Sequence, residues 1–222
     1  MDYKLLYNNK ESFSKKFPIP HTTGRVGQLS PPANPWDSGG TFGDGNSSFI
    51  KKLIVLHDIK YVIELGVGEG ASTRAMLDAL DVTNGQLYGC DITNFPQLPH
   101  EHQRFHFSQE AGEIFINKFL PETCDLMHID TSPHNYQQMH YWMFESNCLS
   151  KVKIGGFVAL HDMGNSWDDK VWGEDHGGDT PDQWQNHRGP VKEFVDLNEG
   201  KWDWGFNPDS NRWGMIWLRR LV

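Results

Sequence analysis

A short apolar run followed by three closely spaced glycines constrains this chain more than any other feature. The run, Tyr61–Leu65, is too short for a helix and has the aliphatic residues of a buried strand. Gly66, Gly68 and Gly70 follow, and residues without a Cβ let the backbone turn tightly and approach a ligand. A helix predicted to begin at Ala71 would direct its free N–H groups at that ligand. The stretch therefore predicts a strand–turn–helix unit that binds a ligand.

Two classes of cofactor use such a unit. Gly66, Gly68 and Ala71 have the spacing G-x-G-x-x-G/A, which indicates NAD or FAD. Glu64 argues against a dinucleotide, because a carboxylate beside the turn repels a pyrophosphate and attracts a cationic ligand. The pattern E-x-G-x-G-x-G, from Glu64 to Gly70, resembles the first motif of class I S-adenosylmethionine-dependent methyltransferases. Their cofactor carries an ammonium and a sulfonium group, as the resemblance implies.

Length, charge and cysteine usage limit the class of protein. A chain of 222 residues is long enough for one α/β domain with a sizeable core. Its net charge of −9 offers no basic surface to nucleic acid, and it has no apolar run of membrane-spanning length. The three cysteines have unrelated spacings and predict neither a disulfide framework nor a zinc site. We therefore expect a cytoplasmic protein, with a homo-oligomer left open; a small-molecule acceptor is what the methyltransferase resemblance implies.

Loop-rich composition marks two segments of the chain. Residues 1–48 are rich in proline and glycine but carry aromatic residues, which predicts an N-terminal leader or substrate lid before a domain at 49–222. Residues 163–188, rich in glycine, aspartate and tryptophan, predict a long loop that acts as an acceptor lid. A helix over 190–197, with Pro190 in its first turn, would precede two closing strands at 202–206 and 213–218.

Four more buried strands are predicted, and three of them end in an acid. They span 86–92, 104–108, 125–130 and 157–162, with helices over 49–57, 71–80, 110–120 and from about 136 to 150. Open parallel sheets bind ligands at the carboxyl ends of their strands. Asp91 would there accept hydrogen bonds from ribose hydroxyls, which suits NAD and S-adenosylmethionine equally. Ser108 and Gln109 lie where a polar side chain could reach an adenine ring.

The order of these features is more specific than any one of them. Over about residues 60–162 the chain resembles methyltransferase family 24, which is similar to the cephalosporin-hydroxylase-like and macrolide sugar O-methyltransferases. The resemblance implies a Rossmann-like, seven-stranded and mostly parallel sheet of order 3-2-1-4-5-7-6 with helices on both faces. The family pattern Asp-Gly-x-His-x-Tyr has one residue more here and no glycine, which leaves the placement of His134 open. The features that carry the resemblance are Glu64 with the glycine turn, Asp91, Asp130, His134, Tyr136, Gly155, Gly156, His161 and Asp162.

The resemblance also implies roles for single residues. Asp130 and Asp162 would bind Mg²⁺, a hard cation that carboxylates on adjacent strands suit and that lowers the pKa of a bound hydroxyl. His161 would be a third ligand, a partner of Asp162 or only a strand-end residue. His134 would be the general base, next to Asp130 in the catalytic set. The implied cofactor-binding set is Glu64, Gly66, Gly68, Gly70, Ser72, Asp91, Ser108, Gln109 and Asp130.

Taken together, these features predict an S-adenosylmethionine-dependent O-methyltransferase, assisted by Mg²⁺, that acts on a hydroxyl of a small saccharide, glycosylated or phenolic acceptor. One alternative is a non-catalytic cofactor-binding protein of the same fold, which the altered segment 130–136 supports. Another is an NAD(P)-dependent oxidoreductase, which Glu64 and the closing hairpin disfavour. Thr131-Ser132-Pro133 is also similar to the Ser-Pro-Pro-aromatic signature of DNA amino-methyltransferases, but the acidic chain disfavours a nucleic-acid substrate.

Overall fold

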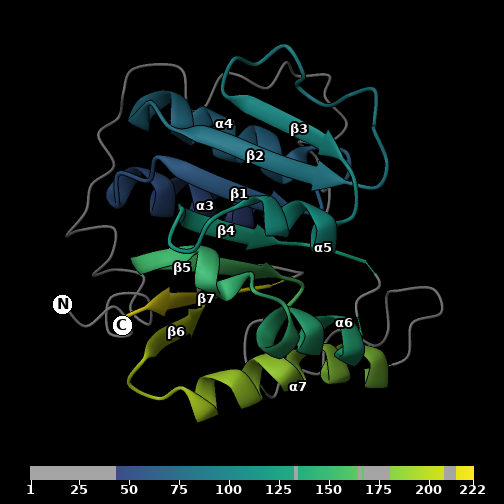
Figure 1. The fold of residues 1–222 in the computed structure, drawn as a ribbon, viewed down its shortest axis with the longest axis vertical. Coiled ribbons are helices and arrows are strands. Elements are labelled where there is room, and N and C mark those ends of the chain that lie inside the picture. The colour runs from purple at the N-terminus through teal and green to yellow at the C-terminus, as the bar shows by residue number, and fades with distance from the viewer. Residues whose placement is uncertain (1–43, 133–134, 165–166, 168–180, 208–213) are drawn as a thin grey trace.

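The computed structural model of the protein describes residues 44–132, 135–164, 167, 181–207 and 214–222. Their strands form one seven-stranded sheet of order β3-β2-β1-β4-β5-β7-β6 (Figure 1). Neighbours among β1 to β5 are parallel, and β7 runs antiparallel to both β5 and β6. The predicted sheet and its order are therefore confirmed. The strands are β1 (Tyr61–Leu65), β2 (Gln86–Asp91), β3 (Phe105–Gln109), β4 (Cys124–Ile129), β5 (Val152–His161), β6 (Trp202–Phe206) and β7 (Met215–Arg220).

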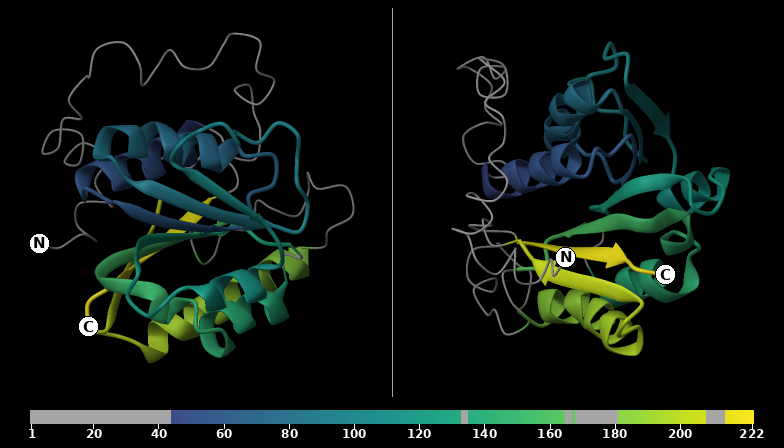
Figure 2. Two further views of the ribbon diagram at one scale, coloured as in Figure 1. Left: turned by 45° about the horizontal axis from the view of Figure 1, so that its top comes forward. Right: turned by 90° about the vertical axis from the view of Figure 1, so that its left-hand side faces the viewer.

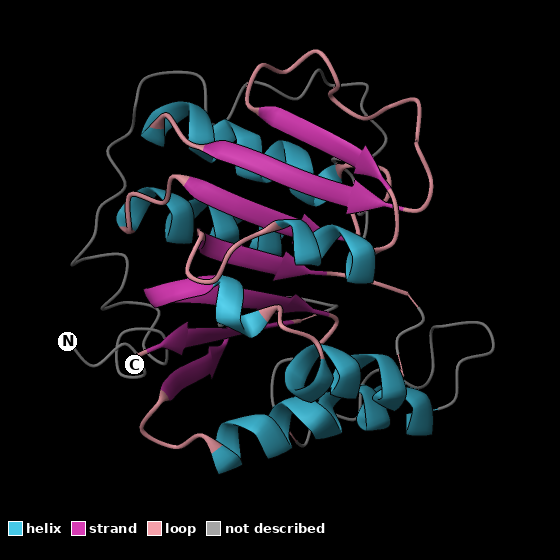
Figure 3. Ribbon diagram, in the orientation of Figure 1, coloured by secondary structure: helices cyan, strands magenta, loops and turns pink. Residues whose placement is uncertain are grey.

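Helices cover both faces of this sheet, as Figures 2 and 3 show. On one face α3 (Asp44–Leu56) and α4 (Ala71–Thr83) pack into a core that includes Trp217 of β7. On the other face α5 (Gly112–Phe115), α6 (Tyr136–His140) and α7 (Pro181–Leu197) surround a second core that includes Trp142. None of the described helices combines the length and the apolar character needed to cross a membrane.

Three predicted helices differ most from the structure in extent, and local chemistry explains two of these differences. The helix expected over 110–120 is only α5 with the 3-10 turn η2 (Ile116–Lys118), because Pro121 disfavours a helical residue before it. The helix expected to reach residue 150 breaks after α6 and the π turn η3 (Tyr141–Glu145), ahead of a 3-10 turn η4 (Leu149–Lys151). There the hydroxyl of Ser146 donates to the carbonyl of Trp142 at 3.0 Å and competes with the helical hydrogen bonds.

The third error concerns α7, which begins at Pro181 inside the segment predicted as the 163–188 lid. Pro190 therefore lies inside the helix and not in its first turn. A proline there removes one N–H donor, and burial of Val191, Phe194 and Val195 in the second core offsets that cost. Similarly, α3 begins at Asp44, ahead of the predicted boundary at residue 48. Residues 1–43 and 168–180 lie outside the described part of the chain, so the leader and the remaining lid stay predictions.

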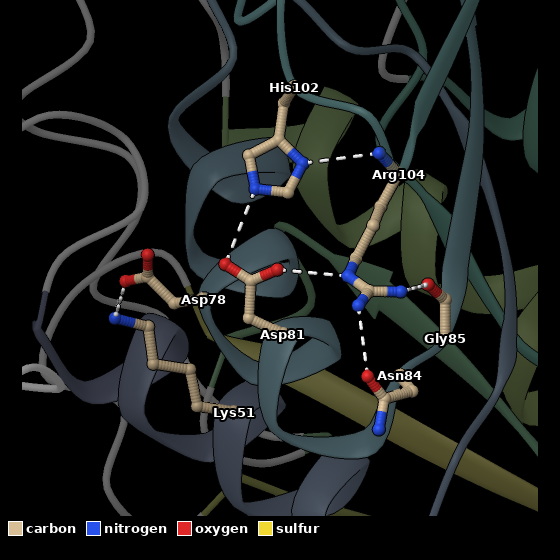
Figure 4. A network of polar contacts seen from close by, with 7 residues as sticks. All are labelled: Lys51, Asp78, Asp81, Asn84, Gly85, His102 and Arg104. Atoms are coloured by element: carbon tan, nitrogen blue, oxygen red, sulfur yellow. Dashed lines mark hydrogen bonds and ion pairs between the residues drawn. The ribbon is translucent and has the colours of Figure 1, made fainter.

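A polar network fastens the edge strand β3 to α4 (Figure 4). The guanidinium of Arg104 donates to Oδ1 of Asp81 at 2.9 Å, to Oδ1 of Asn84 at 3.0 Å and to the carbonyl of Gly85 at 3.2 Å. Lys51 of α3 forms an ion pair of 2.6 Å with Asp78 of α4. The Arg104 contacts hold β3, which ends with Ser108 and Gln109, against the rest of the sheet.

The three cysteines are free and buried, and their chemistry gives a first prediction. Burial raises the pKa of Cys90 and of Cys148 to about 12, and it also raises the pKa of Cys124. The thiolate is the reactive form of cysteine. We therefore expect Ellman's reagent at pH 8 to label no thiol of the folded protein and all three in urea. Rapid labelling of one equivalent without denaturant would contradict this burial.

Candidate active site

The glycine turn between β1 and α4 adopts the backbone conformation that its sequence predicts. Gly66, Gly68 and Gly70 have φ angles of 83°, 52° and 82°, which only glycine adopts readily. A Cβ on Gly66 would lie 1.9 Å from the carbonyl oxygen of Asp130. The backbone of the turn thus touches the backbone that follows β4, and the amide of Asp130 donates to the carbonyl of Leu65 at 2.9 Å. This contact brings the turn and the acid at the end of β4 into one site.

The site is a cavity of about 670 Å³ at the carboxyl ends of β1, β2, β4 and β5, a volume typical of cofactor sites. Six carboxylates line it, from Glu69, Asp91, Glu110, Glu113, Asp130 and Asp162. No lysine or arginine is found among the described residues that line the cavity. Its wall is therefore strongly favourable for a cationic ligand and unfavourable for phosphates. The other polar and charged side chains that line it are Ser72, Thr93, Thr131, Ser132, Gln138 and His161.

Glu64 lies behind the glycine turn and not on the cavity wall. Its side chain is fully buried, and its carboxylate accepts hydrogen bonds from the hydroxyls of Ser72 and Thr73, the latter at 2.7 Å. Nδ1 of His128, on the neighbouring strand, lies 3.5 Å from Oε1 of Glu64. Ser72 does line the cavity. Glu64 is therefore placed to hold the first turn of α4 against β1, with Ser72 between its carboxylate and any ligand.

Asp91 ends β2 and faces the cavity, as its place in the sequence predicts. Its Oδ2 accepts the amide of Gly68 at 2.9 Å, and its Oδ1 accepts the amide of Thr93 at 2.9 Å. Each carboxylate oxygen has a second lone pair, so the carboxylate can still accept hydrogen bonds from a ligand. The two amides fix its orientation before a ligand arrives.

The acids that follow β4 and β5 meet around one histidine. Nδ1 of His161 lies 3.0 Å from Oδ1 of Asp162 and 3.3 Å from Oδ2 of Asp130. One potential ligand atom from each residue lies within 4.8 Å of the others, so the three could hold a metal ion. Burial acts to lower the pKa of His161, but the two carboxylates outweigh it and raise that pKa well above its usual value. Asp162 has a φ of 61°, the left-handed region that aspartate and asparagine tolerate better than most residues.

Two of the predicted adenine-side residues are not on the wall of the cavity. The hydroxyl of Ser108 donates to Glu110, and Nε2 of Gln109 donates to the carbonyl of Ile92 at 3.2 Å. Glu110, which the sequence analysis did not single out, is the lining residue there. Hydrogen bonds from Lys118 and Ser108 lower the pKa of Glu110, so it stays a carboxylate. The sequence did hold a signal for Glu110, because it directly follows Ser108 and Gln109 at the end of the predicted strand.

Other predicted residues differ in how they meet the cavity. Gly70 is the N-cap residue of α4 and contacts Leu98 but does not line the cavity. His134 lies outside the described residues, so its role as general base stays a prediction. Trp142 belongs to the second core and also lines the cavity, where its Nε1 donates to the hydroxyl of Thr131 at 2.9 Å.

Comparisons with known proteins place the chain by sequence and by fold. Residues 63–163 match a family described as a methyltransferase domain, methyltransferase family 24. A comparison with curated protein sequences finds no match. Among solved structures, the fold is similar to the S-adenosylhomocysteine-bound methyltransferase PaMTH1 of Podospora anserina, with a TM-score of 0.57, 14% identity, and coverage of 78% of this chain and 77% of that chain. An O-methyltransferase from Bacillus cereus in complex with S-adenosylhomocysteine has a TM-score of 0.57 and 14% identity, with coverage of 80% and 81%.

The sheet order, the glycine turn and the acid-lined cavity together define a class I methyltransferase fold. The central segment of the chain, residues 63–163, matches methyltransferase family 24, and the resemblance recognised in the sequence is confirmed over that segment.

Proposed function

We propose that the protein transfers the methyl group of S-adenosylmethionine to a hydroxyl of a small acceptor. The observation that carries the proposal is the cavity wall, which has six carboxylates and, among the described lining residues, no lysine or arginine. S-adenosylmethionine is a cation at its sulfonium and ammonium groups, whereas NAD(P) brings phosphates that such a wall repels. The two solved structures named above contain S-adenosylhomocysteine, and one of them is an O-methyltransferase, which supports the same assignment.

The residues of the wall suit the parts of this cofactor. Asp91 would accept the ribose hydroxyls, and Glu110 would accept the exocyclic amine of adenine. The glycine turn and the free N–H groups at the start of α4 would face the methionine part, with Ser72 at the wall and Glu64 behind it. The hydrogen bonds to the carboxylates of Asp91 and Glu110 would be charge-assisted, and such bonds are stronger than those between neutral groups.

We also propose that a divalent cation assists the reaction. The donor set fits one, because Asp130 and Asp162 offer hard carboxylate oxygens at the ends of adjacent strands. When bound, such an ion would lower the pKa of the acceptor hydroxyl. The chain's own residues orient the acceptor beside the sulfonium for in-line attack. The methyl carbon then leaves the sulfonium, which becomes a thioether, and bonds to the hydroxyl oxygen, whose proton passes to a base for which His134 remains the candidate.

A neutral hydroxylated molecule, such as a saccharide or a phenol, suits a cavity in which carboxylates would repel an anionic acceptor. The same carboxylates and the net charge of −9 disfavour nucleic acid. A homo-oligomer and a cytoplasmic location remain expectations of the sequence.

Calorimetric titration of the purified protein with S-adenosylhomocysteine and with NADH, each with and without Mg²⁺, tests the cofactor assignment. We expect S-adenosylhomocysteine to bind and NADH not to bind. Asp91→Ala should weaken that binding about 10- to 100-fold, since a hydrogen bond to a charged group contributes about 1.5–3 kcal/mol. Glu64→Gln should weaken it less, because Glu64 acts through Ser72. Asp196→Ala, which removes an exposed carboxylate paired with Lys192, is the matched control and should change nothing.

Each other outcome of that titration has a definite meaning. Binding of NADH without binding of S-adenosylhomocysteine would replace the proposal with an oxidoreductase. Binding of neither would contradict the cofactor assignment. If S-adenosylhomocysteine binds but no hydroxylated acceptor yields methylated product in a screen, the non-catalytic alternative becomes the better interpretation.

A further inference from the structure

A line of buried amides leads from the backbone to the ring of His161. Nδ2 of Asn207 donates to the carbonyl of Gly45 at 3.3 Å and to Oδ1 of Asn46 at 2.8 Å. Nδ2 of Asn46 then lies 3.3 Å from Nε2 of His161. The side chains of Asn46, Asn207 and His161 are each at most 3% exposed, so water does not substitute for these contacts. The line joins α3, the end of β6 and the end of β5.

The directions of these hydrogen bonds follow from the carbonyl of Gly45. A carbonyl oxygen can only accept, so the nitrogen of the Asn207 amide must face it. The same nitrogen faces Asn46, which must present its oxygen to Asn207 and its nitrogen to His161. Nε2 of His161 must then accept, and the proton of a neutral ring is left on Nδ1.

The opposite side of the ring independently favours the same arrangement. Nδ1 of His161 lies between Oδ1 of Asp162 and Oδ2 of Asp130, at 3.0 and 3.3 Å. A bare nitrogen lone pair facing two carboxylates would be repelled, whereas an N–H is attracted to both. An N–H on Nδ1 cannot at the same time bind a metal ion, because ligation requires the lone pair of that nitrogen.

We propose that Asn207 and Asn46 are positioning residues that hold the proton of His161 on Nδ1, so that His161 orients the carboxylates of Asp130 and Asp162 and is not itself a metal ligand. The proposal rests on the proposed function for the role of the metal site, but the position of the proton on His161 can be tested without any catalysis. It assigns the metal-binding role to the two carboxylates alone. Partners of this kind behind a metal site usually change metal affinity about 10- to 100-fold when they are removed.

The ring nitrogens of His161 can be observed directly by long-range ¹H–¹⁵N correlation spectra of the full chain, with the His161 signals identified from a His161→Asn variant. Because the two carboxylates raise the pKa of His161, the spectra are recorded at alkaline pH, where the ring is neutral. We expect that neutral ring to carry its proton on Nδ1, both before and after Mg²⁺ is added. A proton found on Nε2 with Nδ1 bare, or a signal of Nδ1 that shows ligation when Mg²⁺ is added, would overturn the proposal. Neither reading needs an acceptor or the methyl donor, so failure of the proposed function would leave this test intact.

Asn46→Asp separates positioning from a merely structural role. The new carboxylate keeps an oxygen towards Asn207 but presents a second oxygen, and not an N–H, to Nε2 of His161. It should therefore draw a proton onto Nε2 and weaken Mg²⁺ binding about 10-fold or more through the displaced carboxylates. Asn46→Leu removes both polar groups but leaves the two carboxylates beside Nδ1, so it should change the tautomer and the Mg²⁺ affinity less than Asn46→Asp does.

The matched control is Asn198→Asp. Asn198 also donates through its side chain, at 2.9 Å, to the carbonyl of Phe194 near the end of α7. This variant should lower stability modestly and leave the ring of His161 unchanged. An Asn46→Asp protein that folds and shows an unaltered His161 ring would contradict a positioning role for Asn46.

Discussion

Gly66→Ala is expected to abolish binding of S-adenosylhomocysteine and to lower the free energy of unfolding by about 2–5 kcal/mol. Two costs add. The left-handed φ of 83° penalises an alanine by about 1–2 kcal/mol. The new Cβ would also stand 1.9 Å from the carbonyl oxygen of Asp130, and such overpacking typically costs about 1–3 kcal/mol. Because a carbonyl of the backbone cannot rotate away as a side chain can, the turn and the segment after β4 must separate.

Gly200→Ala is the matched control for this prediction. Gly200 has nearly the same φ, 79°, but a Cβ there would meet no heavy atom within 4 Å. The control therefore carries the backbone cost of about 1–2 kcal/mol without the collision. Urea unfolding of both variants and calorimetric titration with S-adenosylhomocysteine measure the difference. Equal losses of stability, with cofactor binding kept in Gly66→Ala, would show that the turn does not depend on its contact with Asp130.

The edge of the sheet at which Gly66 meets Asp130 is the part of the site that could be predicted from the sequence. Parallel strands end at one edge of a sheet, so Asp91, Asp130 and Asp162 had to meet there once each was recognised as the end of a strand. The glycine spacing required left-handed backbone, which Gly66 and Gly70 adopt. At these positions the local sequence pattern and the topology of the sheet predict the same structure, and a prediction on which both agree is the most reliable kind.

What sequence could not predict depends on partners far apart in the chain. Asn46 and Asn207 are 161 residues apart and have no common local signal, yet they share one buried hydrogen bond. Glu64 was predicted to touch the cofactor, but Ser72 and Thr73 fold back onto its carboxylate and enclose it. The extent of α7 depended on its burial against the second core, which overrode the helix-breaking tendency of Pro190.

Asp162→Asn is expected to lower the affinity for Mn²⁺ at least about 100-fold while leaving the fold intact. The substitution replaces one of the two proposed anionic ligands with a neutral amide, and removal of a ligand should exceed the 10- to 100-fold effect of outer partners. Asparagine also tolerates the left-handed φ of 61° at this position, so the backbone after β5 keeps its shape. Asp162→Ala would lose the same ligand and add a backbone cost of about 1–2 kcal/mol.

A second aspartate with a positive φ provides a matched control for this test. Asp58 has a φ of 50° and pairs at the surface with Lys60, at 2.6 Å. Asp58→Asn therefore repeats the chemical change, at a similar backbone conformation, outside the cavity. Electron paramagnetic resonance of added Mn²⁺ and thermal unfolding should show tight binding in this control and loss of binding in Asp162→Asn, at similar melting temperatures. If Asp162→Asn kept the affinity of the control, then Asp162 would not be a metal ligand. The acids that follow β4 and β5 would then pair with His161 and attract the cationic groups of the cofactor instead.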